Sequence, residues 1–185
     1  MSHQLLTPVV GPDDHAQGSP DALVTLVEYG DYECSRSGRA YVVLAFVKQE
    51  LGDYLRVVFR NFPLTDPHPH ARRAAEAAES VGARGGEDAF WAMHDILYEN
   101  QDALEEDDLL AYAEAVGADP LTVADDLASG AMLHRVRRDV QSGVRSGVDG
   151  TPTFFVNGRR FDGLWSDPAA FAEEIRAAAH AGADG

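Results

Sequence analysis

A strand, a helix and a second strand follow one another between residues 22 and 62, and this succession constrains the fold more than any other feature. ALVTLVEY (22–29) is a nearly continuous apolar, β-branched run, which is typical of a strand buried on both faces of a sheet. Apolar residues then recur at helical spacing from Cys34 to Leu51, before YLRVVFRNF (54–62) repeats the pattern of a buried strand. These lengths predict a parallel crossover between the two strands.

The remaining segments predict a layer of helices and a closing hairpin. The first ~20 residues are rich in Pro, Gly, Asp and His, and we expect an extended lead-in there. Between about residues 67 and 146, five segments have helical patterns bounded by Gly, Pro or an acidic first turn. Asn157-Gly158 lies between two short apolar runs, which predicts a hairpin with a type I′ turn. A last helix is expected to begin at Ser166 or Asp167, with Pro168 in its first turn.

The order β-α-β, helices, β-β-α predicts an α/β fold whose sheet-forming part is interrupted by a helical insertion. We assign residues 1–65 and 147–185 to the sheet-forming domain and residues 66–146 to the helical insertion. A chain of 185 residues can bury a core of this kind without disulfides or a structural metal.

Charge and hydropathy exclude several classes of partner. The formal charge of −16, from 31 acidic against 15 basic residues, argues against nucleic-acid binding and against attraction to anionic membranes. No segment approaches the roughly 18 uninterrupted apolar residues of a membrane span, and MSHQLLTPVVGPDDH lacks the basic start and apolar run of a signal peptide. We therefore expect a soluble, cytoplasmic protein.

Cys34 is the only cysteine, which excludes an intramolecular disulfide and zinc sites built on cysteine pairs. By itself, a single cysteine is most often a small buried hydrophobic residue. A polar turn separates Cys34 from the first strand, however, so the thiol is expected at the N-terminus of the following helix. There the helix dipole, the unpaired backbone N–H groups and two nearby arginines, Arg36 and Arg39, favour the thiolate. Asp31 and Glu33 oppose this effect, and we expect the balance to favour a reactive thiolate.

The second feature of interest is Gly150-Thr151-Pro152-Thr153, directly before the hairpin. Most prolines that open a strand are trans and lie at an edge. Here a cis bond is also consistent with the sequence, because the chain must turn sharply to enter the sheet. A cis-proline loop would expose the backbone N–H and C=O of Thr151 as a short docking edge for an extended peptide or a small thiol.

VEYGDYECSRS early in the chain and GVDGTPTFFVNG late in it, with helices between them, resemble the DsbA-like branch of the thioredoxin superfamily. VVFRNFPLTDPHPHARRAAEAAE and AFWAMHDILYENQ are also similar to that branch, so the resemblance covers most of the chain. It implies a thioredoxin-like fold with a helical insertion, and thiol-disulfide exchange as the activity. It also implies that Cys34 is the attacking cysteine and that Pro152, preceded by Thr151, is the cis-proline.

Ser37 departs from the family pattern, because the C-x-x-C motif normally has its second, resolving cysteine at this position. A hydroxyl cannot form the disulfide that completes the dithiol mechanism, although it can donate a hydrogen bond to the Cys34 thiolate. A serine here is also what a trapping substitution would leave, but Ser35 and Arg36 are unlike the residues often found between the two cysteines. We interpret CSRS as a natural divergence.

The leading hypothesis is a protein-disulfide oxidoreductase or isomerase that works through a single nucleophilic cysteine, Cys34. It would attack a protein disulfide or accept a low-molecular-weight thiol such as glutathione, mycothiol or bacillithiol as co-substrate, with no other cofactor. Thr151 and Pro152 would dock the partner, Ser37 would stabilise the thiolate, and Arg36 would support it. The alternative is a catalytically inactive binding or regulatory module that docks peptides beside the cis-proline loop.

Three histidines and an acidic cluster are candidates for other roles. His68 and His70 could ligate a metal, but an H-P-H loop cannot place both imidazoles on one helix face, so we interpret the loop as a solvated lead-in to a helix and expect no metal site. His94 alternates with large apolar residues, which favours a packed histidine over a catalytic base. The acidic run at residues 105–108 is predicted to stabilise a helix N-terminus.

Overall fold

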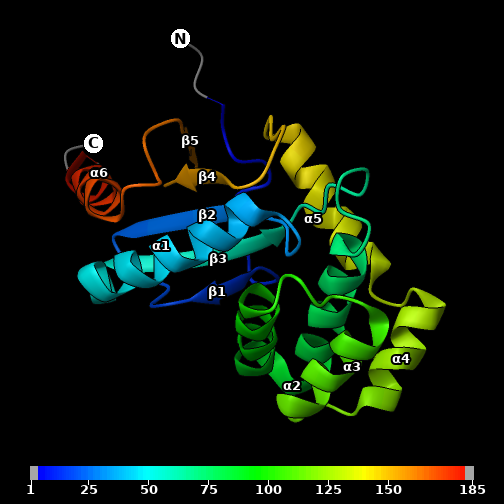
Figure 1. Cartoon of the computed structure of the whole chain (residues 1–185). Helices are drawn as coiled ribbons and strands as arrows, with labels where there is room; N and C mark the ends of the chain where they lie inside the picture. The colour runs from blue at the N-terminus through cyan, green and yellow to red at the C-terminus, as the bar shows by residue number, and fades with distance from the viewer. Residues whose placement is uncertain (1–3, 182–185) are drawn as a thin grey trace.

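The sheet has five strands in the order β1-β3-β2-β4-β5 (Figure 1) in the computed structural model, which describes residues 4–181. The strands are β1 (His15–Gln17), β2 (Val24–Gly30), β3 (Leu55–Asn61), β4 (Thr153–Val156) and β5 (Arg159–Phe161). β2 and β3 are parallel, in register from Val24 opposite Leu55, and every other pair is antiparallel. The helix α1 (Ser35–Leu51) connects β2 to β3, so the predicted crossover is confirmed.

Both faces of the sheet are covered, as the apolar pattern of its central strands requires. Because side chains alternate along a strand, Val24 and Leu26 of β2 face one side, where they pack with α1 and with α6 (Pro168–Ala181). Val27 and Tyr29 face the other side and pack with the N-terminal segment and with residues that precede β4. The result is an α/β thioredoxin-like fold with a helical insertion between β3 and β4. The exact division at residues 65 and 147 stays a prediction.

The insertion consists of four helices beyond one end of the sheet (Figure 1), and its core is continuous with Tyr32 and Phe59 of the sheet-forming part. They are α2 (Ala71–Glu99), α3 (Glu106–Ala115), α4 (Pro120–Ser129) and α5 (Leu133–Arg145). Gly86 interrupts α2 with φ 77° and ψ −168°, so the helix has two arms that correspond to the first two of the five predicted segments. A Cβ at Gly82 would lie 2.9 Å from the Cβ of Phe90, which shows how closely the arms approach each other.

Local turn and capping predictions are confirmed. Asn157 and Gly158 both have positive φ, 47° and 78°, as a type I′ turn requires. At the start of α6 the Asp167 carboxylate accepts a hydrogen bond from the Ala170 N–H at 3.0 Å, which identifies Asp167 as the N-cap. The acidic run at residues 105–108 forms a capping box at the start of α3.

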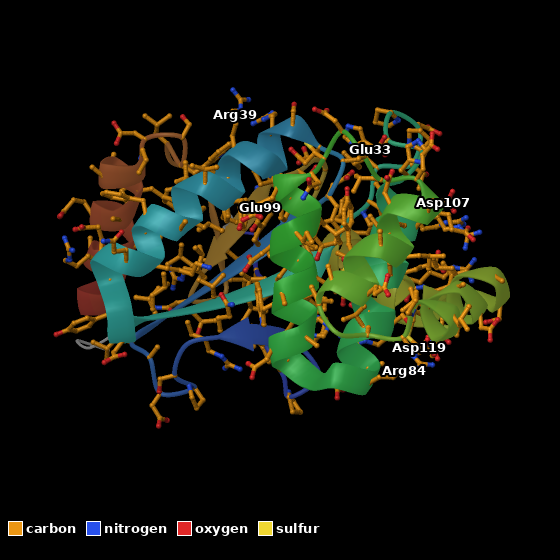
Figure 2. All side chains as sticks on the ribbon, turned by 60° about the horizontal axis from the view of Figure 1, so that its bottom comes forward. Glu33, Arg39, Arg84, Glu99, Asp107 and Asp119 are labelled. Carbon is orange, nitrogen blue, oxygen red and sulfur yellow. The ribbon has the colours of Figure 1, made fainter. Side chains whose placement is uncertain are left out.

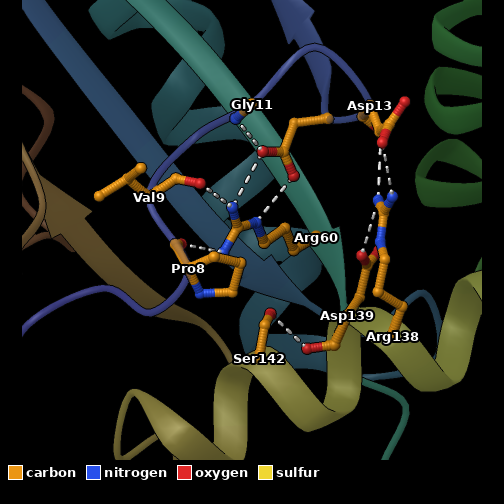
Figure 3. Close-up of a pocket in the computed structure, with 9 residues that line it drawn as sticks. Pro8, Val9, Gly11, Asp13, Arg60, Arg138, Asp139 and Ser142 are labelled. Carbon is orange, nitrogen blue, oxygen red and sulfur yellow. Dashed lines mark hydrogen bonds and ion pairs between the residues drawn. The ribbon is translucent and has the colours of Figure 1, made fainter.

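The N-terminal segment is more ordered than the expected extended lead-in, because it contributes the edge strand β1 to the sheet. Its three residues, His-Ala-Gln, carry no apolar alternation, so no strand pattern was visible in the sequence. Side chains fix the segment: the Arg60 guanidinium donates to both carboxylate oxygens of Asp14 and to the carbonyls of Pro8 and Val9 (Figure 3). Within residues 4–181 no helix has the length and apolar character needed to cross a bilayer.

His94 is a packed residue, as predicted. Its ring centroid lies 4.6 Å from that of Phe59 and 4.8 Å from that of Trp91, and its Nδ1 is 3.1 Å from the hydroxyl of Tyr32. Burial lowers the pKa of His94 to about 3, so the imidazole is neutral in the folded protein.

This burial predicts a specific loss of stability in acid. As the pH falls below the ordinary value of 6.5, the unfolded chain binds a proton at His94 that the folded protein does not, so the free energy of unfolding falls. Between about pH 6.5 and about pH 4.5 this one group should remove roughly 2 kcal/mol. Urea unfolding of His94→Phe should show a correspondingly shallower pH dependence, whereas His134→Phe, which changes an exposed histidine of α5, should not. Equal slopes for His94→Phe and the wild type would contradict this account.

Candidate functional site

Cys34 is the N-cap residue of α1, with φ −77° and ψ 118°. Its carbonyl accepts the first helical hydrogen bond, from the Gly38 N–H at 3.0 Å, and its own N–H donates to the carbonyl of Asp31 at 3.1 Å. The parallel crossover produces this position, because the chain must leave the end of β2 and turn back into the helix that covers the sheet. The thiol therefore lies at the positive end of the α1 dipole.

The structure brings Cys34 and the second sequence feature together although they are far apart in the chain. The Thr151–Pro152 peptide bond is cis, and the Cys34 thiol donates to the Thr151 carbonyl with Sγ 3.5 Å from the oxygen. Cys34 is 7% exposed, and Thr151 is 6% exposed. The Thr151 Oγ1 is buried without a hydrogen-bond partner among the described residues. Solvent thus reaches little of either residue, and the Thr151 hydroxyl is unpaired.

Ser37 is completely buried one turn into α1. Its hydroxyl oxygen accepts a hydrogen bond from the Asp31 N–H at 3.4 Å. Within the described part of the chain no hydrogen bond joins Ser37 to Cys34. In this structure Ser37 therefore supports the turn before Cys34, and its predicted contact with the thiolate stays a prediction.

Arg36 and Arg39 are exposed on the first turns of α1. Figure 2 shows Arg39 extending away from the protein into solvent. Both guanidiniums therefore act on the thiol only through solvent, where screening weakens them. The predicted support from Arg36 is at most a long-range electrostatic one.

Asp31 and Glu33, which were expected to oppose the thiolate, direct their carboxylates toward the insertion. Asp31 is buried and accepts hydrogen bonds from the Leu64 N–H at 2.8 Å and from His68 Nδ1 at 2.7 Å. One Glu33 oxygen accepts from the N–H groups of His70 and Ala71, at 2.7 and 2.9 Å, where α2 begins. Their charge is thus taken up by an imidazole, by backbone donors and by the N-terminus of α2.

The loop is largely exposed and leads into α2, as predicted, but His68 itself is anchored, because its Nδ1 lies 2.7 Å from the Asp31 carboxylate. No local pattern marks this pair, since 37 residues separate the partners. Across residues 4–181 no group of three or more His, Cys, Asp or Glu side chains is arranged to hold a metal ion.

Gln101 is a site residue that sequence reasoning missed. It lies in the turn after α2, and its Nε2 donates to the carbonyls of Tyr32 at 2.7 Å and of Cys34 at 3.0 Å. A lone glutamine after a helix has no pattern that marks it, and only the tertiary fold brings it to the turn that carries the cysteine.

Glu28 is a second missed residue, and here a sequence signal existed. It is 2% exposed on β2, on the face that carries Val24 and Leu26 and lies under α1. Its Oε1 has no hydrogen-bond partner among the described residues, and burial raises the pKa of Glu28 to about 8. A carboxylate inside the apolar run ALVTLVEY was the visible clue, because charged residues are rarely buried without a partner.

A thioredoxin-like sheet, a cysteine at the N-cap of its first crossover helix and a cis-proline facing the sulfur together define the DsbA-like class of thiol-disulfide oxidoreductase folds. This chain belongs to the thioredoxin family: a family model described as thioredoxin matches residues 11–175.

Solved structures agree with this assignment. BdbD from Bacillus subtilis superposes with a TM-score of 0.80 at 25% identity, covering 90% of this chain and 93% of that chain. Alpha-DsbA1 from Wolbachia pipientis has a TM-score of 0.77 at 16% identity, covering 92% of this chain and 93% of that one, which shows the fold alone.

Similar curated proteins are longer. The sodium/proton antiporter NhaA 3 of Salinispora tropica is 44% identical over 179 residues, which is 96% of this chain and 26% of that protein. The antiporter NhaA 1 of Mycobacterium sp. (strain KMS) is 42% identical, over 94% of this chain and 28% of its own length. The chain thus spans about a quarter of the length of the curated relatives it matches.

Proposed function

We propose that this chain is a DsbA-like thiol-disulfide oxidoreductase that exchanges disulfides through Cys34 alone. The observation that carries the proposal is the position of the Cys34 sulfur, at the N-cap of α1 and 3.5 Å from the carbonyl of Thr151, which precedes the cis-proline. A helix N-terminus favours the thiolate, and the thiolate is the nucleophile in thiol-disulfide exchange.

The exchange has two steps. Cys34 loses its proton to water, and the thiolate attacks one sulfur of a disulfide; the new Cys34–S bond forms as the old S–S bond breaks, and the second sulfur leaves as a thiolate. An external thiolate then attacks the partner sulfur of the mixed disulfide, forms a new disulfide with it and releases the Cys34 thiolate. Because position 37 holds serine, no second thiol within the motif can perform this release. Glutathione, mycothiol or bacillithiol is the class of small thiol that would serve.

Thr151 and Pro152 are proposed to dock the partner. Loss of the Cys34 proton removes the thiol's hydrogen bond to the Thr151 carbonyl, which then becomes free to accept from a backbone N–H of an incoming peptide. The Thr151 hydroxyl is also unpaired but buried, so we propose that it donates to the partner only once docking uncovers it. Ser37 is proposed to assist by holding the turn, and Arg36 by long-range attraction.

This chain matches only about a quarter of the length of its antiporter relatives, and no helix among residues 4–181 could cross a bilayer. For this chain we propose thiol chemistry.

The second candidate function is a binding or regulatory module without turnover. The low exposure of Cys34, 7%, favours it, because a sulfur that reagents cannot reach performs no exchange. The two functions predict different rates for the reaction of native Cys34 with a thiol-specific reagent.

Alkylation of the native protein at neutral pH tests the proposal. Iodoacetamide should add one label per chain, and it should react faster with the native protein than with the same protein unfolded in urea, whose cysteine supplies the intrinsic rate in the same sequence. Glutathione disulfide should add one glutathione to the intact mass, and reduced glutathione should remove it. Labelling seen only after unfolding would instead support the binding module.

A further inference from the structure

The turn after α2 holds the backbone on both sides of residue 33. Gln101 Nε2 donates to the carbonyl of Tyr32 at 2.7 Å and to that of Cys34 at 3.0 Å. The two partners are 69 and 67 residues away in the chain, so neither bond is part of local secondary structure. One side-chain amide therefore fixes the peptide group that enters Glu33 and the peptide group that leaves Cys34.

The other end of the same amide lies against α1. A Cβ built on Gly38 would overlap Gln101 Oε1, so the side chain is seated directly on the helix turn that begins at Cys34. Gly38 also donates its N–H to the Cys34 carbonyl, which makes that carbonyl the acceptor of both the first α1 hydrogen bond and the Gln101 bond. The glycine at residue 38 leaves the space that this arrangement needs.

We propose that Gln101 is a positioning residue, which fixes the Cys34 peptide so that Sγ faces the Thr151 carbonyl and which thereby raises the reactivity of the thiol. This inference rests on the proposed function. Its physical basis is twofold. Two N–H bonds remove rotational freedom from the backbone that carries the sulfur, and they offset the negative ends of two carbonyl dipoles close to a developing thiolate.

A substitution that removes the N–H donors of Gln101 but keeps the length of its side chain tests the proposal. Gln101→Met should reduce the rate of native alkylation relative to the urea-unfolded rate by about fivefold, which corresponds to one ordinary hydrogen bond, and it should move the midpoint of the alkylation pH profile upward. The matched control is Asn100→Ala, which removes a bond from the Asn100 amide to the Ile96 carbonyl in the same turn. If both variants lower the rate equally, Gln101 acts only through the stability of the turn and the proposal is wrong.

Gly38→Ala supplies a second variant that leaves Gln101 present. The new methyl group should displace the amide and lower the native alkylation rate as Gln101→Met does, whereas in a Gln101→Ala background, where the space is empty, it should cause no further loss. Additive effects of Gly38→Ala and Gln101→Ala would overturn the proposal. A wild-type protein that fails to react with glutathione disulfide would count against the proposed function; a reactive wild type with an equally reactive Gln101→Met would count against Gln101 alone.

Discussion

Alanine in place of Cys34 is expected to abolish disulfide exchange completely. The chain has no other thiol, and a methyl group can neither attack a disulfide nor hold a mixed one. The intact mass of Cys34→Ala should not change on incubation with glutathione disulfide, and glutathione-driven reduction of insulin should fall to the rate without protein. The fold should survive, because the removed sulfur makes a single hydrogen bond, to the Thr151 carbonyl, and is small.

Ser35→Ala is the matched control, because Ser35 is exposed, adjoins Cys34 and forms the first residue of α1. It should retain the adduct and the insulin reduction. Equal activity in the wild type and Cys34→Ala would eliminate the thiol mechanism. Capture of a partner that persists in Cys34→Ala, with no exchange in either protein, would establish the binding module in its place.

Glutamine in place of Glu28 is expected to stabilise the protein strongly at alkaline pH. Burial raises the pKa of this carboxyl from 4.5 to about 8, so the folded protein keeps the proton that the unfolded chain loses. Between these values the unfolded state binds fewer protons than the folded state, and the wild-type free energy of unfolding therefore falls as the pH rises. The full loss for the shift is on the order of 4 to 5 kcal/mol.

Glu28→Gln cannot ionise, so its advantage over the wild type should be smallest near pH 5 and should grow to several kcal/mol near pH 8. Urea denaturation at both pH values measures this difference. Glu50→Gln, which changes an exposed carboxylate on α1, should give a curve parallel to that of the wild type. A parallel curve for Glu28→Gln would mean that the buried carboxyl finds a compensating partner when it ionises.

The sheet and its crossover could be predicted because their information is local. The apolar run of β2, the helical spacing of α1 and the Asn157-Gly158 turn each specify a backbone shape within a few residues. β1 could not be predicted, because three polar residues become a strand only by pairing with β3 and through the contacts of Arg60 with the segment before it.

The distinction between local patterns and tertiary contacts also applies to the candidate site. Cys34 and Pro152 were identified from motifs, since a thiol at a helix start and a proline at a strand start are visible in a short stretch of sequence. Gln101 and the Asp31–His68 pair depend on how the insertion packs on the turn before Cys34, and no local pattern encodes such packing. Glu28 could be predicted only in part: the apolar run around it indicated a buried strand, but nothing explained a carboxyl group inside that strand.

The kink at Gly86 also limits how this chain can vary in length. A straight helix of 29 residues would separate its ends by about 43 Å, yet Glu33 contacts the beginning of α2 while Gln101, just after its end, contacts the neighbouring Tyr32 and Cys34. The two arms are residues 71–85 and 87–99. The second arm must therefore run back along the first and be of nearly equal length. A deletion in one arm without a matching deletion in the other would leave one of these anchors out of reach, so gene variants of this segment should shorten or lengthen both arms together.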